Sequence, residues 1–195
     1  AEAQRERENW YGCTKTSQEQ LVRGWFQASK TNGKISKDFL YAAICPTMVI
    51  GPPLYEIDNP KESVGGTMGT LQRWLRGGRA GVAPNDSMSF VHVEDCAKMH
   101  TRLLDYSTQN QQAMVNEHCR YMSLVESLHW NDLLTMMKEL YPSLPDFQPY
   151  EGDDRVTPTQ FNLDNMKSLQ VPLRTTRETM EDSIGYLKQI GALDQ

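Results

Sequence analysis

The chain has 195 residues, of which 38% are hydrophobic and 23% are charged. These values are typical of an ordinary globular domain and argue against intrinsic disorder. The 20 basic and 25 acidic residues give a net charge of -5. Such a chain lacks the broad cationic surface that binds nucleic acid or anionic membranes, so we expect no nucleic-acid partner.

No apolar stretch approaches the roughly 20 residues needed to cross a bilayer, and the first eight residues lack the apolar core of a signal peptide. We therefore expect a soluble, intracellular protein of the cytoplasm or an organelle. The cysteines are scattered and form no CxxC pair, which favours reduced thiols over a zinc site or a disulfide framework: Cys13, Cys45, Cys96 and Cys119. The run Glu117-His118-Cys119 falls in an expected strand, and we predict no metal there.

The first expected element is a long helix from Asn9 to Lys30, where apolar residues recur at spacings of three and four. Thr31-Asn32-Gly33 supplies its C-terminal stop. The run from Phe39 to Ile50 is almost continuously apolar and ends at Gly51-Pro52-Pro53. That pattern predicts a strand buried on both faces and therefore a parallel sheet.

After a polar loop, Ser63 to Arg76 is expected to be a helix that ends at two glycines. A strand at Ser87 to Val93 and a helix at Glu94 to Tyr106 follow, with Asp95 near the N-terminus of that helix. The remaining expectations are strands at 119–125 and 159–163, a helix at 130–140 and a helical turn at 164–169.

The last expected helix has the clearest local signals. Thr175 and Glu178 have the spacing of a capping box, and apolar residues line one face before Gly191: Met180, Ile184, Leu187 and Ile190. Because strands and helices alternate along the whole chain, the sequence predicts an α/β fold.

Tyr11 and Lys15 form a Tyr-x-x-x-Lys pair at the start of the long helix, so both side chains should lie on one helical face. A phenol has a reference pKa near 10, and a neighbouring ammonium favours the phenolate. Such a tyrosine can exchange a proton with a substrate oxygen, as the reduction of a carbonyl by hydride requires. The spacing alone is weak evidence, because a surface pair would have it too.

The surrounding residues make the motif more specific. The segment from Asn9 to Gln20, with the pattern Asn-Trp-Tyr-x-x-x-Lys-x-x-x-Glu-Gln, resembles the catalytic helix of the dihydroflavonol and cinnamoyl-CoA reductases. These enzymes are extended short-chain dehydrogenases/reductases. The run Cys45 to Pro52 is similar to the family's Pro-x-x-Val-x-Gly-Pro stretch, with Pro46 and Val49 at the matching positions. The run Phe90 to Ala97 is similar to its Phe-Val-His-Val-x-Asp-Val-Ala segment.

A fourth block, from Phe161 through Val171-Pro172-Leu173 to the capped helix, resembles the family's closing lobe. The resemblance implies NAD(P)H-dependent reduction of a ketone or aldehyde. It implies that Tyr11 is the acid/base and Lys15 a contact to the nicotinamide ribose, and that Pro46 and Val49 meet the nicotinamide. His92 and Asp95 are expected to be structural.

The family's glycine-rich phosphate loop has no counterpart in this chain, since it lies before the catalytic helix. Gly65-Gly66-Thr67-Met68-Gly69 follows a polar loop instead of a strand, so it lacks the context of such a loop. The residue that separates NAD from NADP is also missing. The chain has no initiator Met, and we expect it to be processed, truncated or otherwise part of a longer polypeptide, and to bind no dinucleotide by itself.

The expected fold is thus the C-terminal part of a Rossmann-like doubly wound parallel sheet with a small α/β substrate lobe, without the first nucleotide-binding half. Residues 1–53 would supply the catalytic helix and a central strand, and residues 54–195 mainly the lobe, with a returning strand and helix near 87–106. Two functions remain open. One is a carbonyl reductase that uses NADP or NAD when complete, and the other is a non-catalytic accessory subunit, for example of an organellar membrane complex. In both, the missing half or another protein would cover the exposed sheet edge.

Overall fold

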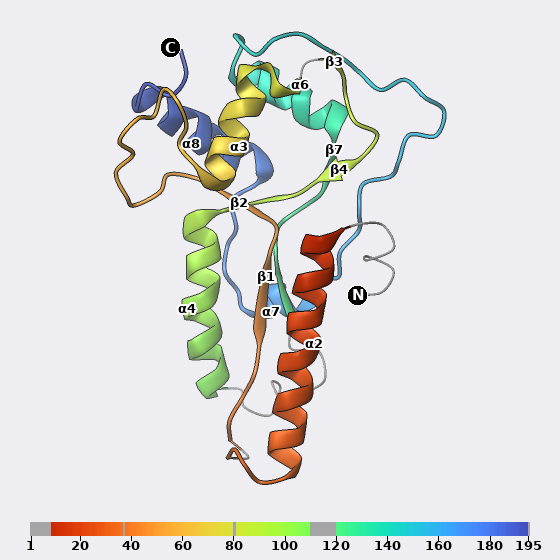
Figure 1. Cartoon of the computed structure of the whole chain (residues 1–195), viewed down its shortest axis with the longest axis vertical. Helices are drawn as coiled ribbons and strands as arrows, with labels where there is room; N and C mark the ends of the chain where they lie inside the picture. Colours follow the sequence, from red (N-terminus) through yellow and green to blue (C-terminus); the bar gives the residue numbers. More distant parts are fainter. Residues whose placement is uncertain (1–8, 37, 80, 110–119, 195) are drawn as a thin grey trace. The chain divides into compact units, whose positions relative to one another are not determined.

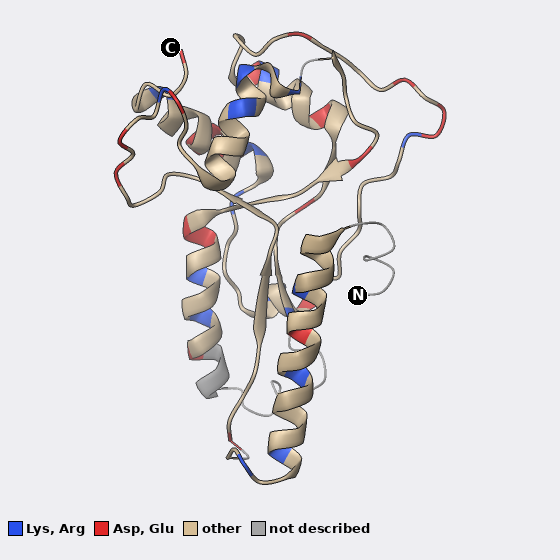
Figure 2. Ribbon diagram, viewed as in Figure 1, with Lys and Arg blue, Asp and Glu red and all other residues tan. Residues whose placement is uncertain are grey.

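The computed structural model describes residues 9–36, 38–79, 81–109 and 120–194 (Figure 1). The chain divides into two compact units, one made of residues 1–42 and 110–119 and the other of residues 43–109 and 120–195. Each is described by itself. Charged residues of both signs are spread over the elements of each unit, as Figure 2 shows.

The first unit contains the long helix α2, Trp10–Thr31. Asn9 caps its N-terminus, where the side chain accepts a hydrogen bond of 2.8 Å from the Gly12 N–H. The helix ends at Asn32, and Gly33 then takes a φ of 66°, which glycine adopts without strain. The ring of Phe26 contacts the rings of Phe39 and Tyr41. The predicted helix is confirmed.

In its described residues, the second unit holds four pairs of short strands. Two parallel pairs lie at its centre: β1 (Ala43–Pro46) with β6 (Arg120–Ser123), and β2 (Met48–Ile50) with β5 (Phe90–His92). A third parallel pair joins β3 (Gly81–Val82) to β8 (Phe147–Gln148), and one antiparallel pair joins β4 (Ser87–Met88) to β7 (Leu128–His129). The fold is α/β with short parallel strands, and the last two pairs include strands that we did not expect: β3, β7 and β8.

The predicted strand from Phe39 to Ile50 is wrong in two respects. Regular pairing begins only at Ala43, and it breaks at Thr47. At this residue the backbone changes partner, because Thr47 bonds to the Ser123 carbonyl while the Met48 N–H bonds to the Ser89 carbonyl. Strand β1 is also half-buried with Pro46 exposed, and not buried on both faces.

The helices of the second unit follow the sequence closely. They are α3 (Gly66–Arg73), the π-turn η1 (Trp74–Gly78), α4 (Val93–Gln109), α6 (Trp130–Leu140), α7 (Asp164–Ser168) and α8 (Thr176–Gln189). The capping box between Thr175 and Glu178 is present. The strand predicted at 87–93 is present as β4 and β5, interrupted at Ser89 and followed by α4 at Val93, whereas 159–163 forms no strand. Cys119 lies outside the described residues.

The core lies where α3, α6 and α8 pack around β2 and β5. Trp74 and Trp130 pack edge to face with ring centroids 5.0 Å apart, an arrangement worth about 1 kcal/mol beyond the apolar area buried. The buried Gln72 amide donates to the Pro60 and Ala192 carbonyls and accepts from the Val64 N–H. This single side chain therefore ties the loop before α3 to the end of the chain.

Within the residues that the structure describes, no helix is both long and apolar enough to cross a membrane.

Candidate functional site

Tyr11 and Lys15 lie one turn apart on α2, and the Lys15 Nζ is 5.6 Å from the centroid of the Tyr11 ring. An ammonium at this distance over an aromatic face is attracted to it. The two side chains thus share one face of the helix, as their spacing predicts. Tyr11 is 75% exposed, so its hydroxyl can be reached by a small molecule. Thr14 instead donates its hydroxyl to the Trp10 carbonyl of the same helix.

Pro46 and Val49 belong to the second unit, where Pro46 is the last residue of β1 and Val49 the middle residue of β2, the next strand along the chain. Pro46 pairs in register with Ser123, and Val49 with Val91. The Val49 carbonyl accepts a hydrogen bond from the Thr67 hydroxyl of α3. In sheets of this kind, ligands bind beyond the carboxyl ends of the strands. Tyr11 and Lys15 lie in the other unit, so their approach to this strand end stays a prediction.

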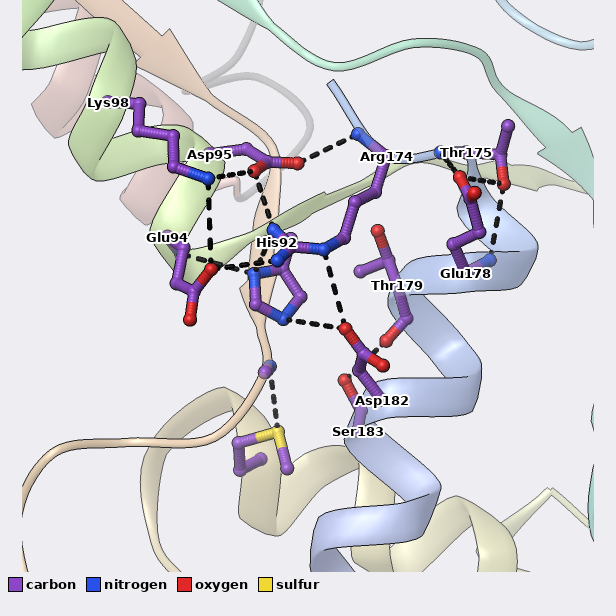
Figure 3. A network of polar contacts seen from close by, with 12 residues as sticks. His92, Glu94, Asp95, Lys98, Arg174, Thr175, Glu178, Thr179, Asp182 and Ser183 are labelled. Atoms are coloured by element: carbon purple, nitrogen blue, oxygen red, sulfur yellow. Dashed lines mark hydrogen bonds and ion pairs between the residues drawn. The ribbon is translucent and has the colours of Figure 1, made fainter. Parts of the chain in front are cut away.

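A polar network surrounds Arg174, which precedes α8 (Figure 3). Its Nη1 donates to Asp95 Oδ1 over 2.6 Å, and its backbone N–H donates to Asp95 Oδ2 over 2.8 Å. Its Nη2 donates to Glu94 Oε2 over 2.7 Å, and its Nε lies 3.4 Å from Asp182 Oδ2. The guanidinium therefore connects the first turn of α4 with α8.

His92 is the most buried ionisable side chain of this network, with 2% of its surface exposed. Its Nδ1 lies 3.2 Å from the Glu94 N–H and 3.0 Å from Arg174 Nη1. Burial lowers the pKa of His92 below its ordinary value of 6.5, and the Arg174 charge lowers it further. His92 and Asp95 bind other groups of the fold, which agrees with the structural role expected for them.

Sequence reasoning missed Arg174, Glu94 and Asp182 as members of one cluster. Figure 2 shows that α4 begins with acidic residues, which favour a helix N-terminus on their own account. The available signal was the position of Arg174, a basic residue directly before a capping box. Nothing local in the sequence indicates that its partners lie about 80 residues earlier.

The thiols and glycines offer no alternative centre. In the described part of the chain, no three or more His, Cys, Asp or Glu side chains are grouped to hold a metal, and Cys13 and Cys96 are free thiols. Glu117, His118 and Cys119 lie outside the described residues. Gly65 and Gly66 have positive φ angles at the start of α3 and follow a loop, as expected, so they lack the strand-to-helix turn of a phosphate-binding loop.

Sequence comparison finds relatives along almost the entire chain, although no protein-family model matches it. Cinnamoyl-CoA reductase 1 of Oryza sativa subsp. japonica is 24% identical over 188 residues, and cinnamoyl-CoA reductase 2 of Medicago truncatula is 25% identical over 187 residues. The chain is a distant homologue of the cinnamoyl-CoA and dihydroflavonol reductases. Each match covers 95% of this chain and 49% of the relative. This reductase homologue thus spans about half the length of its curated relatives.

Solved structures give the same fold. Yeast methylglyoxal/isovaleraldehyde reductase, determined with NADPH, has a TM-score of 0.62 at 18% identity, with 88% of this chain and 50% of that chain covered. Vestitone reductase from alfalfa (Medicago sativa) has a TM-score of 0.58 at 14% identity, with 88% and 50% covered. At these identities the likeness establishes the α/β fold, over about half of each solved structure, and nothing finer.

Proposed function

We propose that this reductase homologue is the C-terminal, catalytic-helix and substrate-lobe part of an NAD(P)H-dependent ketone or aldehyde reductase. The observation that supports the proposal most is the contact between Lys15 and Tyr11 on an exposed helix face, in a chain that matches cinnamoyl-CoA reductases over 95% of its length. The alternation of strands and helices supports this proposal, since a Rossmann-like doubly wound sheet requires it.

In this proposal Tyr11 is the general acid. Its hydroxyl donates a proton to the substrate oxygen as the carbonyl carbon accepts hydride, so the carbonyl becomes an alcohol. A bound nicotinamide would supply that hydride. The Lys15 ammonium stabilises the phenolate left on Tyr11 and contacts the nicotinamide ribose. Pro46 and Val49 would lie against the nicotinamide ring.

The residues present suit the nicotinamide end of the cofactor better than its phosphates. A phenol and an ammonium share one exposed face of α2, and Pro46 is exposed at the end of its strand. For the pyrophosphate, the Gly65-Gly66 pair is unsuitable because it follows a loop. We therefore expect that NADP or NAD binds only when a nucleotide-binding half is supplied.

The most direct test is substitution of Tyr11 by Phe in a protein that includes the nucleotide-binding half. We expect carbonyl reduction to fall by about 100-fold or more while cofactor affinity changes little, because only the proton donor is removed. Tyr55→Phe is the matched control, since Tyr55 is likewise exposed but has no assigned role. Undiminished turnover in Tyr11→Phe would remove Tyr11 from the mechanism.

The second candidate is a non-catalytic subunit derived from a reductase, such as a module of an organellar membrane complex. It is favoured by the pairing of β1 and β6, which form a sheet of two strands in the described part of the chain. Isolated pairs of strands are marginally stable, so further strands or another protein should cover them. Helix α2 also exposes large apolar side chains, among them Leu21 and Trp25.

Calorimetric titration of the purified 195-residue chain with NADPH and NADH separates the possibilities. We expect no measurable binding by the chain alone, and recovery of binding when the nucleotide-binding half is added. Saturable micromolar binding of NADPH or NADH by a monodisperse monomer would contradict the proposal that a separate nucleotide-binding half is needed. Binding that never appears, with copurification of unrelated subunits, would favour the accessory role.

A further inference from the structure

Two histidines of the second unit begin helices in the same way. The Nδ1 of His92 accepts a hydrogen bond from the Glu94 N–H at the start of α4, and the Nδ1 of His129 accepts one from the Asn131 N–H at the start of α6. Each ring thus satisfies a backbone N–H that a helix terminus leaves without an intrahelical partner. His92 also lies within hydrogen-bond distance of a guanidinium, that of Arg174 in the segment before α8, whereas Arg155 acts on His129 through its charge.

The hydrogen-bond geometry fixes the protonation state of His92. Two donors, the Glu94 N–H and Arg174 Nη1, point at Nδ1, so Nδ1 must be the acceptor and the ring must carry its proton on Nε2. The Nε2 is buried without a hydrogen-bond partner, and Asp182 Oδ2 lies 3.6 Å from it. The Nε2 edge of the ring lies beside Gly51, where an added Cβ would come within 2.8 Å of Nε2. His92 can hold Arg174 only in its neutral form.

We propose that His92 and Arg174 form an acid-sensitive latch that ties the start of α8 to the β5–α4 junction and opens when His92 binds a proton.

The charges around the latch determine the direction of the effect. Arg174 faces His92 from the segment before α8, Asp182 faces it from α8, and Glu94 and Asp95 face it from α4. Lys98 lies 3.8 Å from Glu94 and 3.6 Å from Asp95, and so neutralises part of that acidic pair. A proton on Nδ1 would meet two donors and a guanidinium charge. The acidic groups attract the resulting imidazolium, but the hydrogen bond to Arg174 is lost in either case.

The pH range follows from linkage. Burial lowers the pKa of folded His92 below 6.5, so the latch contributes its full stability above pH 6.5 and loses it as the pH falls from there toward the folded pKa. The hydrogen bond from Arg174 holds the pKa of Glu94 below 4.5, so this carboxylate stays ionised in that range. Between pH 6.5 and 4.5, opening of the latch would therefore follow protonation of His92 and not of Glu94.

Opening the latch would release a segment that is already unusual. Gln170 has a φ of 54°, a left-handed conformation that a residue with a side chain adopts at a cost. The residues from Gln170 to Leu173 line a shallow apolar depression together with Val125 and Met166. Arg174 is the next residue, and its backbone N–H is held by Asp95. Loss of the His92 contact would leave Arg174 held by fewer bonds, and so loosen this wall as well as the first turn of α8.

Hydrogen exchange in peptides covering 170–184 tests the latch on the chain as it is purified, with any polypeptide that accompanies it. After correction for intrinsic exchange rates, we expect protection to fall between pH 7.0 and 5.5 by up to about tenfold per pH unit, the limit for uptake of one proton. His92→Asn keeps an acceptor near the Nδ1 position and cannot titrate, so its protection should not change with pH. Arg174→Met should be poorly protected at both values.

His129→Asn is the matched control, because it removes the other buried, helix-capping histidine and leaves Arg174 unchanged. Its α8 peptides should respond to acid as those of the wild type do. If His92→Asn does not fold, titration of the His92 imidazole in the wild type and in Arg174→Met decides the matter. We expect the pKa of His92 to lie below 6.5 in the wild type and to be higher in Arg174→Met, which lacks the guanidinium. Two results would overturn the latch. One is that lowering the pH reduces protection in His92→Asn as much as in the wild type. The other is that the pKa of His92 is the same in Arg174→Met as in the wild type.

Discussion

Replacement of Gly51 by alanine should destabilise the fold at the end of β2, where the chain leaves the strand that carries Val49. Gly51 has a φ of 127°, which side-chain-bearing residues rarely adopt. A Cβ there would lie 2.8 Å from His92 Nε2 and 3.0 Å from Val93 Cγ1. His92 cannot move aside, because it is buried and holds both Glu94 and Arg174.

Two costs add in this variant. A left-handed backbone in a residue other than glycine costs about 1–3 kcal/mol, and forcing an extra methyl group into a packed site costs about 1–3 kcal/mol. We expect the free energy of unfolding to fall by about 2–6 kcal/mol, a large part of the stability of a domain this size. Pulse proteolysis in urea measures the folded fraction at low protein concentration, where aggregation is slow.

Gly185→Ala is the control for this measurement. Gly185 lies on the exposed side of α8, and a Cβ added there would have nothing within 4 Å. Alanine in a helix interior is favoured over glycine by up to about 1 kcal/mol, so this variant should be slightly more stable than the wild type. If Gly51→Ala unfolded at the same urea concentration as the wild type, the packing of His92 against Gly51 would be wrong.

Two further predictions concern local chemistry. Thr175→Ala should lower the free energy of unfolding by about 1 kcal/mol, because it removes the hydroxyl that accepts a hydrogen bond from the Glu178 N–H in the capping box. Thr135→Ala, on the exposed face of α6, should be nearly neutral in the same urea unfolding experiment, and equal effects of the two substitutions would refute the cap. Burial raises the pKa of the Cys96 thiol, and the Ser123 hydroxyl only partly offsets this effect. At pH 8, Cys96 should therefore react with iodoacetamide more slowly than Cys13, which peptide mass mapping can measure. Faster alkylation of Cys96 would contradict its burial.

The features predicted correctly from the sequence are those set by neighbours along the chain. Helix α2 and the cap of α8 depend on residues within three or four positions, as does the shared face of Tyr11 and Lys15. The run from Phe39 to Ile50 was harder because hydropathy does not reveal a change of partner. The break at Thr47 depends on the carbonyls of Ser89 and Ser123, which lie more than 40 residues away in the sequence.

The same distinction separates the two parts of the candidate site. The tyrosine–lysine pair could be found because five consecutive residues determine both its chemistry and its geometry. The network around Arg174 joins positions about 80 residues apart, and each of its members has an ordinary local explanation: a helix cap, an acidic first turn, a basic residue before a cap.

Catalysis and the latch are therefore separate hypotheses that are tested on different residues. Tyr11 and Lys15 belong to the first unit and act, in the proposal, on a substrate and cofactor; His92 and Arg174 belong to the second and act on the fold. Loss of turnover in Tyr11→Phe says nothing about the acid response of α8, and an unresponsive α8 in His92→Asn says nothing about proton donation. Their one physical link is Gly51, which lies against His92 and directly follows the strand of Val49. If reduction by a complete protein weakened with the same pH dependence as the opening of α8, that link would be the structural cause, because the strand end proposed to meet the nicotinamide would lose its support when the latch opened.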